Sequence, residues 1–228
     1  MCESAISRAS EYRPHDLLWV SDASDLMPID TLPAWASAAW LAVAPVVVRR
    51  GPMLGDRVPV GLRGATRNER CAAHVAADRV TRKVTPHDIA RHVSSRLPFR
   101  DSRLPCLRTL ARLAGVLNES SLSWGVTGSV GFTLASGCCV LRADSDLDLL
   151  MRAPDKGDAE ALRDLGLSTR DGESRVDVQV ETPCGAFALK EWLRTGGTVL
   201  LKTAHGPVIC DDPWHSSGLA LPSSLVTT

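Results

Sequence analysis

Residues 123–151 read SWGVTGSVGFTLASGCCVLRADSDLDLLM, and this stretch carries the strongest indication of the fold. It opens with a short apolar run that ends in a glycine-rich turn at Gly128 and Ser129. It closes with Leu147 to Met151, an apolar run interrupted by Asp148. Short apolar segments bounded by turn residues are typical of buried strands. The stretch therefore predicts one strand, a tight turn, and a later strand that carries acidic side chains.

Three carboxylates accompany these predicted strands. Asp146 and Asp148 are two residues apart, so on a strand they would point to the same face. Like charges at that distance repel, which raises one pKa unless a cation lies between them. Asp177 lies in the alternating run VDVQV at 176–180, and a neighbouring strand would bring it to the same side. Carboxylate oxygens suit Mg²⁺. Taken singly, an Asp pair is common in solvated turns, and a polar residue is common on an exposed strand face.

The turn at Gly128 and Ser129 has the chemistry of a phosphate site. Glycine lets a backbone approach an anion closely, and successive N–H groups can donate to its oxygens. The Ser129 hydroxyl adds a further donor. A lone Gly-Ser pair would be an ordinary tight turn, but its combination with three acids is more specific.

This combination resembles the nucleotidyltransferase superfamily of polymerase-β type, in which a Gly-Ser turn precedes Asp-x-Asp and a third Asp follows. The resemblance implies two Mg²⁺ ions bound by Asp146, Asp148 and Asp177. Further motifs extend over nearly the whole chain: WGVTGSVGF (124–132), SDLDLL (145–150), DVQVETP (177–183), RPHDLLW (13–19), PVVVRR (45–50), VGLRG (60–64), GP (206–207) and DPW (212–214). Together they give a closer resemblance, to the phosphoribosyl-dephospho-CoA transferase family of malonate decarboxylase systems.

The family resemblance implies a specific reaction. The donor would be 2′-(5-triphosphoribosyl)-3′-dephospho-CoA, the acceptor a serine of the acyl carrier protein subunit of malonate decarboxylase, and the leaving group pyrophosphate. Asp146 and Asp148 would bind metal, and Asp177 would complete the metal site and accept the attacking proton. Gly128 and Ser129 would hold the triphosphate. Arginines that would neutralise donor phosphates or bind an acidic carrier protein are Arg49, Arg50, Arg63, Arg67 and Arg70.

The fold class that we predict is α+β, with a small N-terminal α+β domain at 1–84. A nucleotidyltransferase-fold domain at 85–228 follows, with a mixed sheet flanked by helices. The first domain would contain a helix at 33–43, strands at 46–48 and 58–62, and a helix at 66–80. Thr66 and Glu69 have capping-box spacing, and that helix would place Arg67 and Arg70 on one face. A solvated helix face is an equally good explanation of this arginine pair.

The second domain would contain one helix that begins at Thr85-Pro86. Three further helices are expected at 107–117, 159–165 and 186–194. Its strands would be those at 123–129 and 147–151, already described, and further strands at 176–180 and 198–201. Residues 97–104 are expected to form a loop. His15 is expected to be a loop residue whose side chain is satisfied by Asp16.

Composition limits the class of protein. The 228 residues have a formal net charge of zero, which argues against a protein that coats nucleic acid. The seven cysteines show no zinc-binding spacing, and we interpret them as reduced thiols of a cytoplasmic protein. No signal peptide and no apolar run of membrane-spanning length is expected. We thus expect no nucleic-acid partner and no membrane partner.

Two alternatives remain open at this point. The chain could be a nucleotidyltransferase that uses an ordinary nucleoside triphosphate with another substrate. It could also be a non-catalytic module that binds CoA or a nucleotide. The first alternative differs from the reaction above in the donor that the enzyme prefers. The second differs in its response to the loss of Asp146, which a binding module should tolerate and an enzyme should not.

Overall fold

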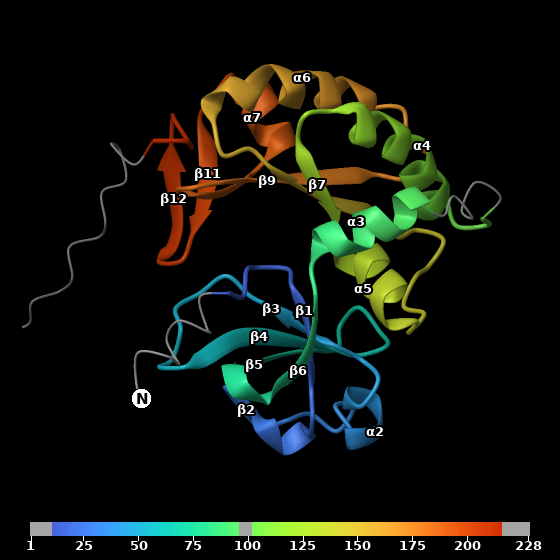
Figure 1. Cartoon of the computed structure of the whole chain (residues 1–228), viewed down its shortest axis with the longest axis vertical. Helices are drawn as coiled ribbons and strands as arrows, with labels where there is room; N and C mark the ends of the chain where they lie inside the picture. The colour runs from blue at the N-terminus through green and yellow to red at the C-terminus, as the bar shows by residue number, and fades with distance from the viewer. Residues whose placement is uncertain (1–10, 96–101, 216–228) are drawn as a thin grey trace, which may run out of the picture.

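The structure, a computed structural model, describes residues 11–95 and 102–215. Within these ranges the chain forms two six-stranded sheets, one from each half, with most of the helices on the second sheet (Figure 1). This architecture confirms the predicted α+β class. None of its helices is long and apolar enough to cross a membrane among the residues described.

The first sheet is antiparallel throughout and has the strand order β2-β5-β4-β3-β1-β6. Its strands are β1 (Leu17–Val20), β2 (Leu26–Pro28), β3 (Val46–Val48), β4 (Arg57–Arg63), β5 (Arg70–Ala76) and β6 (Val80–Val84). Short helical turns are α2 (Ala38–Leu41), η1 (Ala23–Asp25) and η2 (Ala77–Arg79). The core of this sheet consists of alternating apolar residues, for example Val58, Val60 and Leu62 on β4. The strands predicted at 46–48 and 58–62 are confirmed.

Of the two helices predicted in the first half, the one at 66–80 is wrong and the one at 33–43 is much shorter than predicted. Residues 66–80 form a turn, β5, η2 and the start of β6, because β5 pairs with β4 along all seven residues. The turn keeps one contact of the expected capping box, since the Thr66 N–H donates to the Glu69 carboxylate at 2.7 Å. The second predicted helix, at 33–43, is reduced to the single turn α2. Strand pairing thus outweighs local helix signals in this half.

The second sheet is mixed and has the order β12-β11-β10-β9-β8-β7. Its strands are β7 (Ser123–Val126), β8 (Leu147–Arg152), β9 (Val176–Thr182), β10 (Gly185–Ala188), β11 (Val199–Thr203) and β12 (Gly206–Cys210). Its helical elements are α3 (Pro86–Ser95), α4 (Pro105–Glu119), α5 (Gly128–Ser136), α6 (Ala159–Ser168), α7 (Leu189–Thr195) and the turn η3 (Lys156–Asp158). Only β8 and β9 are parallel among these pairs.

Most elements predicted in the second half are confirmed. The helices at 107–117 and 159–165 are α4 and α6, and the strands at 147–151 and 176–180 are β8 and β9. The helix predicted to begin at Thr85-Pro86 is α3, and at its start Thr85 and Asp88 exchange hydrogen bonds at 2.9 and 3.1 Å. The predicted helix at 186–194 is half wrong, because residues 185–188 form β10 and only α7 is helical. Neither α5 nor β12 was predicted. Part of the loop predicted at 97–104 lies outside the described residues.

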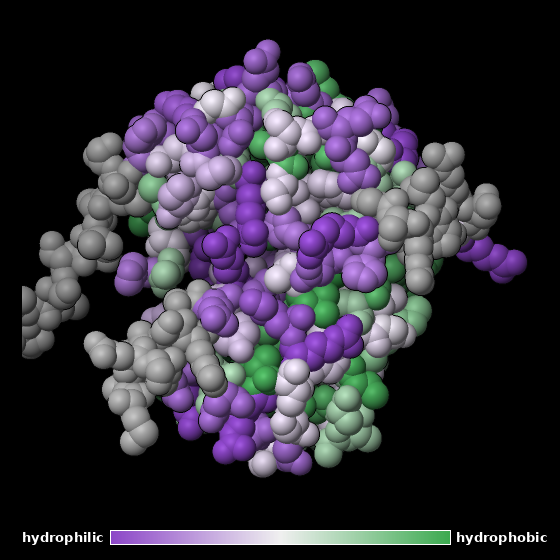
Figure 2. Space-filling view, viewed as in Figure 1, coloured by the Kyte–Doolittle hydropathy of each residue, from purple (hydrophilic) through white to green (hydrophobic). Residues whose placement is uncertain are grey.

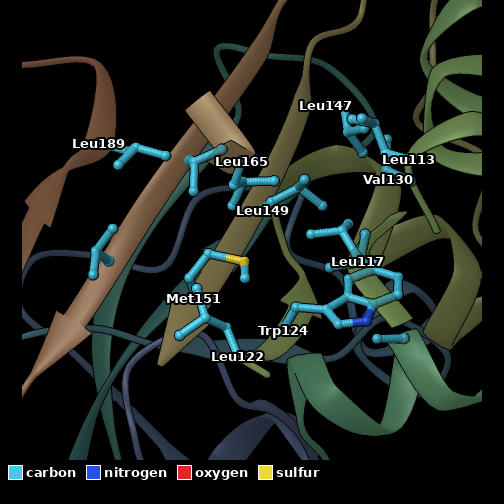
Figure 3. Close-up of a cluster of buried hydrophobic side chains, with 14 of the residues drawn as sticks. Leu113, Leu117, Leu122, Trp124, Val130, Leu147, Leu149, Met151, Leu165 and Leu189 are labelled. Atoms are coloured by element: carbon cyan, nitrogen blue, oxygen red, sulfur yellow. The ribbon is translucent and has the colours of Figure 1, made fainter. Parts of the chain in front are cut away.

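The second core lies between the sheet and its helices. It packs Leu113 and Leu117 of α4 against Trp124 of β7 and Leu147 and Leu149 of β8 (Figure 3). Their burial leaves the opposite face of β8 and β9 turned toward the first sheet, as the contacts described below indicate. Figure 2 shows hydrophilic side chains gathered across the middle of the molecule, where the two halves meet. The candidate site lies at this junction.

Candidate functional site

The Gly-Ser turn is the first turn of α5, and it lies against the strand that carries Asp148. The N–H of Thr127 donates to the carbonyl of Asp148 at 2.9 Å. Gly128 has a φ of 61°, which favours glycine, and a Cβ there would lie 1.9 Å from Asp148 Oδ2. Glycine is therefore required both by the backbone and by the carboxylate. The first N–H groups of α5 are free of intrahelical partners, and such groups favour an anion.

The three predicted acids lie close together. Asp148 and Asp177 are direct partners in the parallel β8–β9 pair, and Asp146 immediately precedes β8. Burial raises the pKa of Asp148, and the charges of Asp146 and Asp177 raise it further, against the opposite effects of Arg175 and Arg63. A raised carboxyl pKa next to other carboxylates marks a place where a cation would be stabilising.

Arg175 already occupies part of this acidic cluster. Its guanidinium forms an ion pair with Asp177, with Nη2 2.6 Å from Oδ2. Among the described residues, no group of three His, Cys, Asp or Glu side chains converges closely enough to hold a metal ion. The oxygen donors nevertheless have the right chemistry for Mg²⁺. Two Mg²⁺ ions on Asp146, Asp148 and Asp177 therefore stay a prediction, and a metal would require Asp177 to leave Arg175.

Arg63 of β4 connects the first sheet to the Gly-Ser turn. Its side chain is buried, and Nη2 donates to the Ser129 hydroxyl at 2.8 Å. Its guanidinium lies 5.3 Å from the centre of the Phe132 ring. Its Nε is buried and has no hydrogen-bond partner among the described residues. Burial, with a contribution from Arg70, lowers the pKa of Arg63 to about 10, so the group stays charged at neutral pH. A buried cation with an unused donor is suited to an anionic ligand.

A cavity of about 560 Å³ lies between the two halves at this point. Arg49, Arg63 and Arg70 line it from the first half, and Gly128 and Phe132 line it from the second. The three carboxylates do not line the cavity, but Gly128 does, and Gly128 also contacts Asp148. The cavity is thus a basic chamber that adjoins the acidic cluster through one glycine.

The other two predicted arginines lie elsewhere. Arg50 pairs with Glu181 at 3.4 Å and lines a different cavity. Arg67 is exposed in the turn between β4 and β5 and lines neither cavity. The shared helix face of Arg67 and Arg70 does not exist, because Arg70 begins β5.

His15 is a residue of the junction whose role the sequence did not indicate. It is a non-glycine residue with a left-handed φ, 75°, and its N–H donates to the Val48 carbonyl at 2.9 Å. Its ring Nε2 lies 2.8 Å from Gln179 Nε2. Burial, with the nearby charges of Arg50 and Lys202, lowers the pKa of His15 to about 4. The ring is therefore neutral at pH 7, and Nε2 accepts a hydrogen bond from the Gln179 amide.

The partner predicted for His15 is wrong, because the Asp16 side chain accepts the N–H of Arg13 at 3.0 Å instead. Arg175 was also missed. Its position two residues before Asp177 would have indicated a shared strand face.

Comparisons with known proteins match the chain to one family, over most of its length. The profile described as phosphoribosyl-dephospho-CoA transferase MdcG N-terminal domain matches residues 13–86, and that of the C-terminal domain matches residues 91–213. A phosphoribosyl-dephospho-CoA transferase of Klebsiella pneumoniae (strain 342) is 46% identical over 210 residues, which cover 91% of this chain and 98% of that protein.

Two relatives of the same name from other organisms are similarly close. The protein of Pseudomonas syringae pv. tomato is 43% identical over 202 residues, and that of Pseudomonas aeruginosa is 41% identical over 202 residues. Each match covers 89% of this chain and 93% of the relative. No solved structure shows a significant match.

Proposed function

Since the chain belongs to the phosphoribosyl-dephospho-CoA transferase family, we propose that its acceptor is a serine of the acyl carrier protein of malonate decarboxylase. The donor would be 2′-(5-triphosphoribosyl)-3′-dephospho-CoA, and pyrophosphate would leave. The observation that best supports a triphosphate donor is the buried Arg63, which donates to Ser129 in the first turn of α5 and whose Nε has no hydrogen-bond partner among the described residues.

In the proposed reaction the serine oxygen bonds to the α-phosphorus, and the bond from the α-phosphorus to the oxygen that bridges to the β-phosphate breaks. Arg63, Arg70 and Arg49 would neutralise the triphosphate in the basic chamber. The N–H groups at Gly128 and Ser129 would orient its oxygens. Asp177, once separated from Arg175, would accept the proton of the attacking hydroxyl. Most of the acceleration would come from positioning and charge stabilisation.

Asp146, Asp148 and Asp177 would hold Mg²⁺ ions, which when bound stabilise negative charge on the attacking and leaving oxygens. Two observations support this assignment: the register that pairs Asp148 with Asp177, and the raised pKa of Asp148. The polymerase-β superfamily and a cytoplasmic location are proposed on the resemblance and the composition alone, as is the absence of nucleic-acid and membrane partners.

The test uses the full chain, the apo carrier protein, Mg²⁺ and one donor at a time, with the carrier followed by intact mass. A gain equal to the phosphoribosyl-dephospho-CoA group supports the proposal. Labelling from ATP or another nucleoside triphosphate, with no transfer from the dephospho-CoA donor, would favour the nucleotidyltransferase alternative. If no donor gives transfer and Asp146→Asn still binds the donor, the non-catalytic module would be favoured.

A further inference from the structure

A second cavity, of about 1020 Å³, adjoins the basic chamber and has no part in the reaction described so far. It lies between the segment that follows β3 and the β11–β12 hairpin. The two cavities share His15, Val47 and Arg49 in their walls. A ligand that fills the basic chamber can therefore extend past His15 into the second cavity. The volume is at the upper end of the range for small-molecule sites.

The second cavity is positively charged. Arg49 and Lys202 line it, and neither forms a salt bridge with any residue that the structure describes. Arg50 contributes less, because Glu181 neutralises part of its charge. None of the described lining residues is acidic. A cavity that is lined by Arg49 and Lys202, with no acid among its described lining residues, favours an anionic group with more than one charge.

The same cavity also has an apolar wall. Val47 of β3, Leu200 of β11 and Pro207 of β12 line it. Leu200 is 42% exposed, although it is a large apolar side chain on a paired strand. A site that combines cations with exposed aliphatic side chains suits a ligand with an anionic part and a long, weakly polar part.

One row of side chains leads from the acidic cluster to this cavity. Asp177, Gln179 and Glu181 occupy alternate positions of β9 and so lie on one face, about 7 Å apart from one to the next. Asp177 belongs to the acidic cluster, and Gln179 holds His15 and lines the second cavity. The His15 ring, which contacts Gln179, lies in the walls of both cavities and so marks the point where they meet.

We propose that the second cavity binds the diphosphate and the pantetheine arm of the dephospho-CoA part of the donor. This inference rests on the proposed function. The donor has two anionic segments, a triphosphate and a diphosphate, with a ribosyl group and an adenosine between them. The basic chamber takes the triphosphate, and Lys202 takes the diphosphate. Arg49, in the wall that the two cavities share, lies between these two anionic segments, and the apolar wall formed with Leu200 takes the pantetheine. The second cavity then selects this donor over a nucleoside triphosphate, which has no such arm.

The test measures binding of 3′-dephospho-CoA to the full chain by titration calorimetry, so it does not depend on transfer. We expect Lys202→Glu to weaken this binding at least tenfold and to leave the binding of inorganic tripolyphosphate unchanged. Lys190→Glu, which changes an exposed lysine on α7 outside both cavities, is the matched control and should bind like the wild type. Leu200→Ser should weaken 3′-dephospho-CoA severalfold but not ADP, which lacks the pantetheine.

Several results would overturn the proposal. One is wild-type affinity for 3′-dephospho-CoA in Lys202→Glu, and another is absence of binding in the wild type. A third is that Lys202→Glu raises the KM for the carrier protein and leaves the KM for the donor unchanged. The cavity would then be a contact site for the carrier protein. If 3′-dephospho-CoA binds as expected while no transfer occurs, the proposed function fails and the binding site stands.

Discussion

Replacement of Gly128 by alanine is expected to abolish most of the activity without unfolding the protein. A Cβ at this position would lie 1.9 Å from Asp148 Oδ2, and the φ of 61° is one that alanine rarely adopts. The conformational part costs roughly 1–2 kcal/mol, partly offset because alanine also restricts the unfolded chain. To restore ordinary contact, the Asp148 carboxylate must withdraw by roughly 1.5 Å. A displacement of about 1 Å at a reacting centre costs on the order of 100-fold in rate.

The opposite end of the same helix supplies a matched control. Gly137 has a φ of 76°, and a Cβ there would have no atom of the described residues within 4 Å. Gly137→Ala therefore carries the conformational cost without the clash. We expect Gly137→Ala to lose a few degrees of melting temperature, at roughly 2–4 °C per kcal/mol for a protein of this size, and Gly128→Ala to lose more, because Asp148 Cβ would also lie only 2.9 Å from the new Cβ. In a carrier-labelling assay, kcat/KM should fall about 100-fold in Gly128→Ala and stay within roughly threefold of the wild type in Gly137→Ala.

Equal activity of the two variants would refute this reasoning. If Gly128→Ala transferred as fast as Gly137→Ala, the position of the Asp148 carboxylate against the turn would have no part in the reaction. If Gly128→Ala were unfolded by circular dichroism, Gly128→Ser and Gly128→Asn would be compared instead, because asparagine tolerates a left-handed φ better than serine does. If Gly128→Asn were clearly more active than Gly128→Ser, activity would depend on the backbone φ. The explanation by a clash with Asp148 would then be contradicted.

Other predictions test separate parts of the site. In metal-free protein, the stability that comes from protonated Asp148 is fully present below its ordinary pKa of 3.8 and is lost as pH rises through the raised pKa of the folded state. Asp148→Asn should thus melt above the wild type at pH 7 in EDTA, with the difference vanishing as pH approaches 3; a lower melting point at pH 7 would contradict the pKa assignment. Arg63→Lys keeps the charge but loses the planar guanidinium whose Nη2 donates to Ser129, so kcat/KM should fall roughly 10–100-fold, whereas Arg67→Lys should change it less than about threefold. An equal loss of kcat/KM in the two variants would show that the buried position of Arg63 does not matter for the reaction. Leu147→Ala removes a fully buried side chain and should lower the free energy of unfolding by about 2–5 kcal/mol in urea denaturation; a loss below 1 kcal/mol would contradict the core packing.

Local patterns predicted the elements that carry the acids, and the family resemblance predicted that the three acids would lie together, but the strand register that brings them together was not predicted. The alternation at 176–180 and the apolar run at 147–151 are short-range features, and both strands are present. Their parallel register, which pairs Asp148 with Asp177, depends on how α6 returns the chain to the sheet and is not visible in either segment alone. A strand-face argument could place each carboxylate, but only the register brings the two together.

The contributions of the first sheet were harder to predict. The capping-box spacing of Thr66 and Glu69 is a true local signal, and it appears here in a hairpin turn because β5 gains a full set of hydrogen bonds from β4. The contact between Arg63 and Ser129 joins residues 66 positions apart, so no periodicity indicates it. Five arginines were therefore treated alike, whereas only Arg49, Arg63 and Arg70 line the basic chamber.

The most direct test of the central claim is a single-turnover reaction that follows both products. Carrier mass and released pyrophosphate are measured with excess enzyme, for the wild type, Asp146→Asn and Asp144→Asn. Asp144 is a nearby exposed aspartate outside the acidic cluster, so its variant controls for the loss of one surface charge. We expect one pyrophosphate per labelled carrier in the wild type and in Asp144→Asn. Asp146→Asn should be slower by about 1000-fold, equivalent to several kcal/mol of transition-state stabilisation. Wild-type transfer by Asp146→Asn, or labelling without pyrophosphate, would contradict the account.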